Sequence, residues 1–298
     1  YPGAVEGELW YDSTNKDFKY QYPNVTTSGS WATSGSLNTA RQQFAGGGIQ
    51  DSALAFGGEN SGTAQLGLTE SYNGSGWTEV ADLNTSRNYN GGTGTSNTAA
   101  LSAGGNTGSN VAIVELWGGS SWTEVNDLNT ARNGLAVGGT TTSSVAAGGD
   151  GSPSAARAKA ETWNGSNWTE ITDLNSARDG IAGGGASNTS SIMFGGFAPS
   201  LSGVTEIWNG SSWTEVNDLS TARAQTGGTG IVTSALCFGG NAGPAVTGKT
   251  ETWNGTNWTE EGDLSVARKT LASAGVNSTS ALAAGGGTPI TSSTEEFT

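Results

Sequence analysis

The sequence repeats itself about every 45 residues, and this repeat limits the possible folds more than any other feature. One arginine recurs six times, at intervals of 46, 45, 46, 45 and 45 residues. A tryptophan keeps the same step, and a Gly-Gly pair closes a short apolar run in every unit. The arginines are Arg41, Arg87, Arg132, Arg178, Arg223 and Arg268, and the tryptophans are Trp31, Trp77, Trp122, Trp168, Trp213 and Trp258. Most of the chain is therefore built from six copies of one unit.

Each unit contains four short candidate strands separated by turn residues. In the unit that begins at Arg178 they cover residues 180–185, 191–194, 205–208 and 213–216. An Asn-Gly pair between the third and fourth strands readily supplies the positive φ angles of a tight hairpin. No stretch shows the 3.6-residue periodicity of a helix, so the pattern predicts a nearly all-β chain.

Four antiparallel strands in about 45 residues are typical of one blade of a β-propeller. The last unit starts at Arg268 and reaches only a third strand, residues 294–297, while a matching fourth strand occurs around Trp31. We therefore predict an all-β, six-bladed propeller of four-stranded antiparallel blades over residues 27–298, with its last blade closed by the N-terminal strand. Residues 1–26 lie outside the repeat and predict a β-hairpin that serves as an attachment segment.

The units resemble the kelch repeat in four features. These are the Gly-Gly pair after the second strand, an aromatic residue on the third, a tryptophan on the fourth and an arginine after it. The resemblance covers about residues 27–298 and implies the six-bladed kelch-like fold. WD40, the other common propeller repeat, needs Gly-His and Trp-Asp pairs, and neither occurs in the sequence.

Composition excludes several classes of function. The chain has no histidine and one cysteine, so Ser-His-Asp catalysis, histidine metal ligands and a thiolate metal cluster are excluded, and we expect no enzyme activity, metal or cofactor. A net charge of -14 opposes binding to nucleic acid. No stretch approaches the roughly 18 apolar residues that a membrane-spanning helix needs, so we expect no membrane insertion.

The repeated charged residues have a structural and a functional interpretation. A ring of arginines could bind anions, but glutamates recur on the third strand of all six units and on the fourth strand of five, for example Glu161 and Glu170. Two carboxylates on one face of a hairpin repel each other unless a cation lies between them, and the repeat arginine is the natural candidate. We therefore expect the arginines, and the tryptophans of the fourth strands (Trp77, Trp122, Trp168, Trp213 and Trp258), to be structural.

A repeated aspartate just before five of the six arginines, such as Asp82, could suggest a calcium ring. One aspartate per blade is too few, so we expect an Asx turn that caps the connection between blades. Cys237 is expected to be a buried core thiol.

The loops between the second and third strands differ from unit to unit and should share a face with the connections between blades. Loops on a rigid scaffold commonly carry binding specificity. The first strands, which line the channel of a propeller, are rich in glycine and alanine and contain nothing that resembles an active site. The candidate binding residues are Leu66, Asp150, Arg157, Lys159, Phe197, Leu201 and Lys249.

Two resemblances indicate a virus particle. Residues 7–22 resemble short hairpins near the ends of phage tail and fibre modules, and the Gly/Ser/Thr/Asn-rich repeats resemble those of virion proteins of marine cyanophages. They imply a structural or fibre protein of an extracellular virion, attached to other virion proteins through residues 1–26, whose loops meet a host-surface glycan, a receptor or a neighbouring subunit. The alternatives are a secreted lectin-like propeller that binds glycans and a kelch adaptor that docks a peptide.

Overall fold

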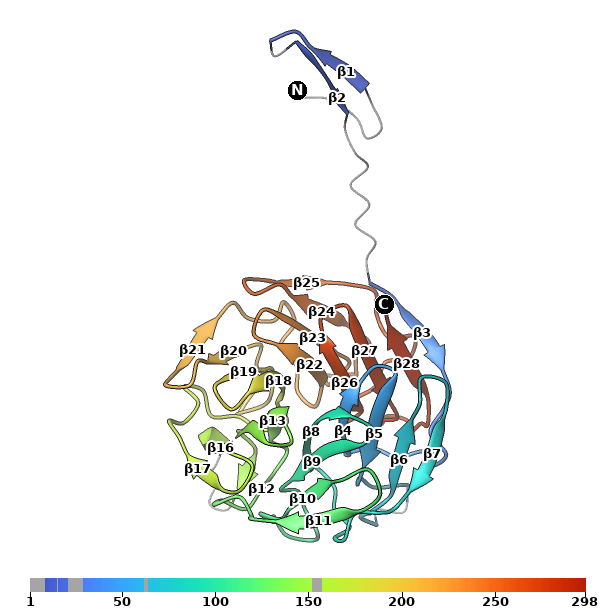
Figure 1. Cartoon of the computed structure of the whole chain (residues 1–298), viewed down its shortest axis with the longest axis vertical. Coiled ribbons are helices and arrows are strands. Elements are labelled where there is room, and N and C mark those ends of the chain that lie inside the picture. Colours follow the sequence, from blue (N-terminus) through green and yellow to red (C-terminus); the bar gives the residue numbers. More distant parts are fainter. Residues whose placement is uncertain (1–8, 15, 21–28, 62–63, 152–156) are drawn as a thin grey trace.

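The structure is a computed structural model that describes residues 9–14, 16–20, 29–61, 64–151 and 157–298. Six four-stranded antiparallel sheets are arranged around a central axis as the blades of a propeller (Figure 1). In every blade the first strand lies nearest the axis and the fourth lies at the outer edge. The predicted fold class is therefore confirmed.

The blades are numbered here in chain order. Blade 1 contains β4 (Ala45–Ile49), β5 (Ser52–Phe56), β6 (Thr69–Tyr72) and β7 (Trp77–Val80), and blade 2 contains β8 (Gly91–Ser96), β9 (Ala99–Ala103), β10 (Val114–Trp117) and β11 (Trp122–Val125). Blade 3 contains β13 (Ala136–Thr140), β14 (Ser143–Ala147), β16 (Ala160–Trp163) and β17 (Trp168–Glu170), and blade 4 contains β18 (Ala182–Ser187), β19 (Ser190–Phe194), β20 (Thr205–Trp208) and β21 (Trp213–Val216). Blade 5 contains β22 (Gly227–Ile231), β23 (Ser234–Phe238), β24 (Thr250–Trp253) and β25 (Trp258–Glu260), and blade 6 contains β26 (Ala272–Asn277), β27 (Ser280–Ala284), β28 (Thr294–Phe297) and β3 (Trp31–Ser34).

Blade 6 is completed by strands from opposite ends of the sequence. β3 pairs with β28 in antiparallel register, with Trp31 opposite Phe297, and the two strands lie side by side in Figure 1. Beyond the strands, the N–H of Ser30 donates to the carbonyl of Thr298 at 2.9 Å, and the reverse bond is 3.1 Å. The predicted closure by the N-terminal strand is thus confirmed, and it leaves blade 6 with the same four strands as the other blades.

The segment before the propeller contains a two-stranded hairpin. β1 (Leu9–Asp12) pairs with β2 (Asp17–Tyr20), with Leu9 opposite Tyr20. The hairpin was expected in this segment, but residues 1–8, 15 and 21–28 lie outside the described residues. The attachment role of residues 1–26 stays a prediction.

A buried glutamate on the third strand ties each blade to the connection that leads into it. Arg41 and Glu70 are 0% and 1% exposed and form an ion pair within blade 1. Asn38, on the connection from blade 6, donates its backbone N–H at 2.7 Å and its side-chain Nδ2 at 2.9 Å to the same carboxylate. Burial lowers the pKa of Arg41, and the charge of Glu70 opposes that shift. Both oxygens of the Glu70 carboxylate therefore accept hydrogen bonds from neighbouring donors.

The same ion pair occurs in all six blades. The other five are Arg87–Glu115, Arg132–Glu161, Arg178–Glu206, Arg223–Glu251 and Arg268–Glu295. Glutamates of the fourth strand, such as Glu79, are exposed, although Glu79 lies directly opposite Glu70 in the register. The repeat arginines are thus buried structural residues, and in blades 1–5, whose hairpins carry two glutamates, only the third-strand glutamate pairs with the arginine.

The repeated aspartates do not form the expected Asx turns. Asp82 accepts a hydrogen bond from the backbone N–H of Thr69 at 3.2 Å. Thr69 starts the third strand of the same blade and lies opposite Val80, so an aspartate two residues beyond Val80 comes next to that N–H. Asp127, Asp218 and Asp263 repeat the contact. The Asx-turn interpretation was wrong, because the carboxylate joins the two ends of one hairpin.

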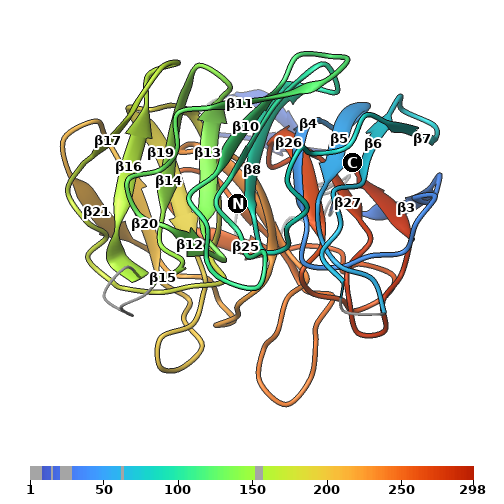
Figure 2. The same cartoon turned by 90° about the horizontal axis from the view of Figure 1, so that it is seen from below.

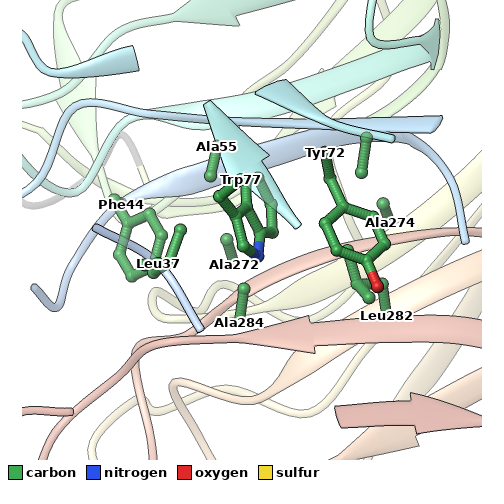
Figure 3. Packing of buried hydrophobic residues seen from close by; sticks show 10 residues of the cluster. Leu37, Phe44, Ala55, Tyr72, Trp77, Ala272, Ala274, Leu282 and Ala284 are labelled. Carbon is green, nitrogen blue, oxygen red and sulfur yellow. The ribbon is translucent and has the colours of Figure 1, made fainter. Parts of the chain in front are cut away.

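Hydrophobic clusters fill the space between neighbouring blades. Figure 3 shows one of them, in which Trp77 of blade 1 lies close to Ala272 and Ala284 of blade 6. In four of the six blades the indole N–H of the fourth-strand tryptophan also crosses to the preceding blade and donates to a threonine hydroxyl. These bonds are Trp77 to Thr294 at 3.0 Å, Trp122 to Thr69 at 3.0 Å, Trp258 to Thr205 at 3.0 Å and Trp31 to Thr250 at 2.8 Å. The tryptophans therefore pack and orient adjacent blades.

Candidate binding face

The loops between second and third strands lie on the same face as the connections between blades, and we call it the variable-loop face. Short antiparallel pairings join the residue after each repeat arginine to the loop of its own blade. In blade 3 this pairing forms a small sheet of β12 (Arg132–Asn133) and β15 (Asp150–Gly151). The other pairs are Gln42 with Glu59, Asn88 with Asn106, Asp179 with Phe197, Ala224 with Asn241 and Lys269 with Gly287. In Figure 2, β12 and β15 lie at the lower face of the disc, where several loops project.

Six backbone hydrogen bonds form a closed ring at the centre of this face. The residue two places after each repeat arginine donates its N–H to the carbonyl of the equivalent residue in the preceding blade, at 2.7–2.9 Å. All six residues have left-handed backbone conformations, with φ between 52° and 62°. The ring residues are Gln43, Tyr89, Gly134, Gly180, Gln225 and Thr270. The sequence offered only one sign of this ring, which is glycine at two of its six positions.

The ring surrounds the entrance of the central channel. A cavity of about 90 Å³ lies there, and Gln43, Tyr89, Gln225 and Thr270 are among its lining residues. The phenol of Tyr89 in blade 2 is hydrogen-bonded to the side chain of Gln225 in blade 5. Burial raises the pKa of Tyr89, and the negative charge of Glu59 adds to the shift. The entrance is thus bordered by uncharged polar side chains that lie near carboxylates.

A network of side-chain hydrogen bonds begins beside this entrance. Glu59 accepts from Gln42 Nε2 at 3.0 Å and from Asn88 Nδ2 at 2.8 Å. The Asn88 amide also donates to Gln43 Oε1 at 2.9 Å, which ties blade 2 to the ring residue of blade 1. These residues were not singled out from the sequence. Each is separated from its partners by a loop or a whole blade, so spacing along the chain does not reveal the contacts.

Further side-chain hydrogen bonds of this network lie between blades 2 and 3. Asn133 Nδ2 donates to Asn110 Oδ1 at 2.5 Å, and Asn110 Nδ2 donates to the carbonyl of Asp150 at 2.9 Å. These bonds join the loop of blade 2 to the short sheet of blade 3. The loops on this side are therefore fixed to one another and to the scaffold.

Four of the predicted binding residues come together between blades 3 and 4. Arg157 lies between two carboxylates, with Nε 3.4 Å from Asp150 Oδ1 and Nη2 3.0 Å from Asp179 Oδ2. Asp179 pairs through its backbone with Phe197, which pairs in turn with Leu201. Phe197 is 40% exposed. Burial raises the pKa of Asp179, while the charge of Arg157 acts in the opposite direction.

The other three predicted residues have different surroundings. Lys159 forms an ion pair with Glu170, which raises the pKa of the lysine, and Lys249 pairs with Glu260 at 3.0 Å. Both partners belong to fourth strands, at the outer edge of the disc. Leu66 is half-buried, and its backbone bonds to Gly58 and Arg87. None of the seven residues has an established binding role, and all remain candidates.

The opposite end of the channel holds a larger cavity of about 260 Å³. Its lining residues come from the first strands and are mostly glycine, with Thr93 and Thr229 among them and Ile49, Ile231 and Val276 toward the strand ends. No charged residue is among them. In the part of the chain that the structure describes, no group of three or more histidine, cysteine, aspartate or glutamate residues could hold a metal ion. Cys237 is buried, and burial raises the pKa of its thiol.

No helix among the described residues has the length and apolar character needed to cross a membrane. No protein-family model matches the sequence, and no curated protein matches it either.

Proposed function

We propose that this chain is a non-enzymatic structural or fibre protein of a bacteriophage particle, in which a rigid kelch-like propeller presents its variable-loop face to a partner. One observation carries the binding part of the proposal. The interior repeats the same Arg–Glu pair in all six blades, whereas the residue after the arginine differs in character around the variable-loop face. Those residues are Gln42, Asn88, Asn133, Asp179, Ala224 and Lys269. A constant scaffold with varied loops is the usual design of a binding surface.

The virion part of the proposal rests on the sequence. Residues 7–22 resemble hairpins of phage tail and fibre modules, and the uniform repeats resemble those of cyanophage virion proteins. A propeller held together by buried ion pairs and indole hydrogen bonds, without a disulfide, suits an extracellular particle because it needs no redox chemistry. In this role, residues 1–26 bind other virion proteins, and the variable-loop face meets a host-surface glycan or receptor.

Removal of residues 1–26 tests the attachment. We expect the truncated chain to keep the thermal unfolding transition of the full chain, because β3 and all blade strands remain. We also expect it to be absent from purified particles. The full chain, supplied from the same vector in parallel, is the control for expression and incorporation. Normal incorporation of the truncated chain would refute the attachment role of residues 1–26.

A secreted lectin-like propeller is the second candidate. The amide-rich network of Asn88, Asn110 and Asn133 favours it, because amide groups both donate to and accept from sugar hydroxyls. This candidate predicts a free species of about 30 kDa in native material instead of a component of a particle.

A further inference from the structure

The ring residues on the variable-loop face are the starting point. Blades 3 and 4 have Gly134 and Gly180 in the ring, and glycine adopts a positive φ without steric conflict. The other four blades carry a side chain there, at φ between 52° and 59°, a conformation that is unfavourable for residues with a Cβ atom. These residues are Gln43, Tyr89, Gln225 and Thr270. Because glycine occupies this position in two copies of the unit, the backbone ring does not itself require a side chain there. The four side chains therefore need another explanation.

The four side chains share one chemical property. They carry two amides, a phenol and a hydroxyl, so all are uncharged groups that both donate and accept hydrogen bonds. All four line the same cavity at the channel entrance. The closed ring of backbone hydrogen bonds fixes their Cα atoms, so little conformational freedom is left for a ligand to remove. The entrance is thus a preorganised polar site.

On the side of blades 3 and 4 the ring is crossed by the side chain of Gln225, which lies over Gly180 and is hydrogen-bonded to the phenol of Tyr89. Gly134 and Gly180 contribute no side chain to the ring, and Gly180 directly follows Asp179. This side of the ring therefore borders the cluster of Asp150, Arg157 and Asp179. A cavity of about 90 Å³ has room for a few water-sized groups, such as the hydroxymethyl or acetamido arm of a sugar, while the rest of the ligand lies across the face.

Most charges around the entrance are negative, although Lys269, the neighbour of Thr270, is a cation on the same face. Glu59 and Asp179 both raise the pKa of Tyr89, so their negative charge reaches the site. Arg157, the cation of the neighbouring cluster, is already paired with two carboxylates. The chain as a whole carries a net charge of -14. An acidic sugar would therefore be repelled and a neutral one would not.

We propose that the channel entrance on the variable-loop face binds a neutral sugar of a surface glycan, through Gln43, Tyr89, Gln225 and Thr270. This inference rests on the proposed function, because it names the ligand class for the same face. A sugar offers several hydroxyls in a fixed arrangement, which amides and hydroxyls can bind, and an apolar ring face that Tyr89 can contact. A basic peptide would instead need free carboxylates at the entrance, and the cavity is lined by neutral groups.

Saturation-transfer NMR on the full chain tests the proposal with free sugars at 10 mM. The probes are glucose, galactose, N-acetylglucosamine, N-acetylgalactosamine, glucuronic acid and N-acetylneuraminic acid. We expect at least one neutral sugar to receive saturation, with signals at least tenfold above those of both acidic sugars. Tyr89→Gly and Gln225→Gly should each weaken the binding at least tenfold, and both should fold because glycine is native to this ring position in blades 3 and 4.

Val276→Ala, at the other end of the channel, is the matched control and should bind as the unchanged chain does. The proposal is overturned if no neutral sugar receives saturation, if the acidic sugars bind better, or if binding survives both glycine substitutions. Failure of the proposed function would be recognised separately, by absence of the chain from particles. A chain that sits in particles but binds no sugar would overturn only this inference.

Discussion

Trp168 of blade 3 and Val114 of blade 2 lie in one buried cluster, and the indole N–H of Trp168 has no hydrogen-bond partner among the described residues. At the equivalent interfaces the tryptophan donates to a threonine, as Trp122 does to Thr69. Valine fills the space of threonine but offers no acceptor. Trp213 faces an alanine in the same position and donates instead to the carbonyl of Thr172 at 3.0 Å. One departure from the repeat has therefore left one buried donor unsatisfied.

Val114→Thr should stabilise the protein by about 1 kcal/mol, because it supplies Trp168 with the acceptor found at other interfaces. The free energy of unfolding in urea measures the effect. Thr69→Val is the reverse substitution at an intact interface, and it should destabilise by about 1–3 kcal/mol because it leaves Trp122 without its acceptor. A loss of stability in Val114→Thr would contradict this account of the interfaces.

The buried ion pairs predict a large difference between two glutamates that face each other. Glu206 and Glu215 are opposite in the register of blade 4, but Glu206 is buried beside Arg178 and Glu215 is exposed. Glu206→Gln leaves a buried guanidinium without its counter-charge and should cost about 3–5 kcal/mol of unfolding free energy. Glu215→Gln should change it by less than about 0.5 kcal/mol. Equal effects of the two substitutions would show that the ion pair is not a main source of stability.

The ring of left-handed residues predicts opposite effects at two equivalent positions. Gly134→Ala adds a Cβ atom at φ 62°, 3.3 Å from the backbone N of Gly180, and should destabilise by about 1–2 kcal/mol. Thr270→Gly removes a β-branched side chain at φ 53°. Because the strained side chain is removed, the free energy of unfolding should stay unchanged or rise by up to about 1 kcal/mol. Glycine also makes the unfolded chain more flexible, and this effect offsets part of the gain. Thermal unfolding of both variants checks the prediction, which fails if Thr270→Gly is the more damaging change.

Tyr72 makes the interface between blade 1 and blade 6, where the ring closes, sensitive to alkaline pH. Its hydroxyl is hydrogen-bonded to Glu296 and Ser34 of blade 6, and burial, with the Glu296 bond next, raises the pKa of Tyr72 to about 12. An unfolded tyrosine loses its proton near pH 10, so the extra stability is complete below pH 10 and is lost as the pH rises to about 12. Unfolding in urea at several pH values should show the stability difference between the unchanged chain and Tyr72→Phe shrinking over that range. A difference that stays constant would refute the stabilising role of the Tyr72 hydroxyl at this interface.

Much of the fold was predictable because the repeat encodes it. The arginine, the tryptophan and the Gly-Gly pair each recur six times, which predicted the number of blades. The last unit has only three strands of its own, which predicted β3 as its fourth strand. The role of Asp82 was missed because it depends on where a hairpin brings its two ends, which composition and spacing do not state.

Less of the candidate site could be predicted, because it depends on contacts between blades. Arg157 was singled out for its charge, but its partner Asp179 belongs to the next blade and carries no distinguishing motif. Lys159 looked equally suitable, yet strand pairing puts it beside Glu170 at the outer edge. The ring at the channel entrance forms only when six blades close, so Tyr89 and Gln225 look like ordinary loop residues in the sequence.

Density-gradient fractionation of native source material, with the chain followed by peptide mass spectrometry, tests the central proposal most directly. A virion protein should sediment with large particles, in a fixed ratio to their other proteins and after repeated washing. Migration of the whole population as a free species of about 30 kDa would contradict the virion assignment and favour a secreted binding protein.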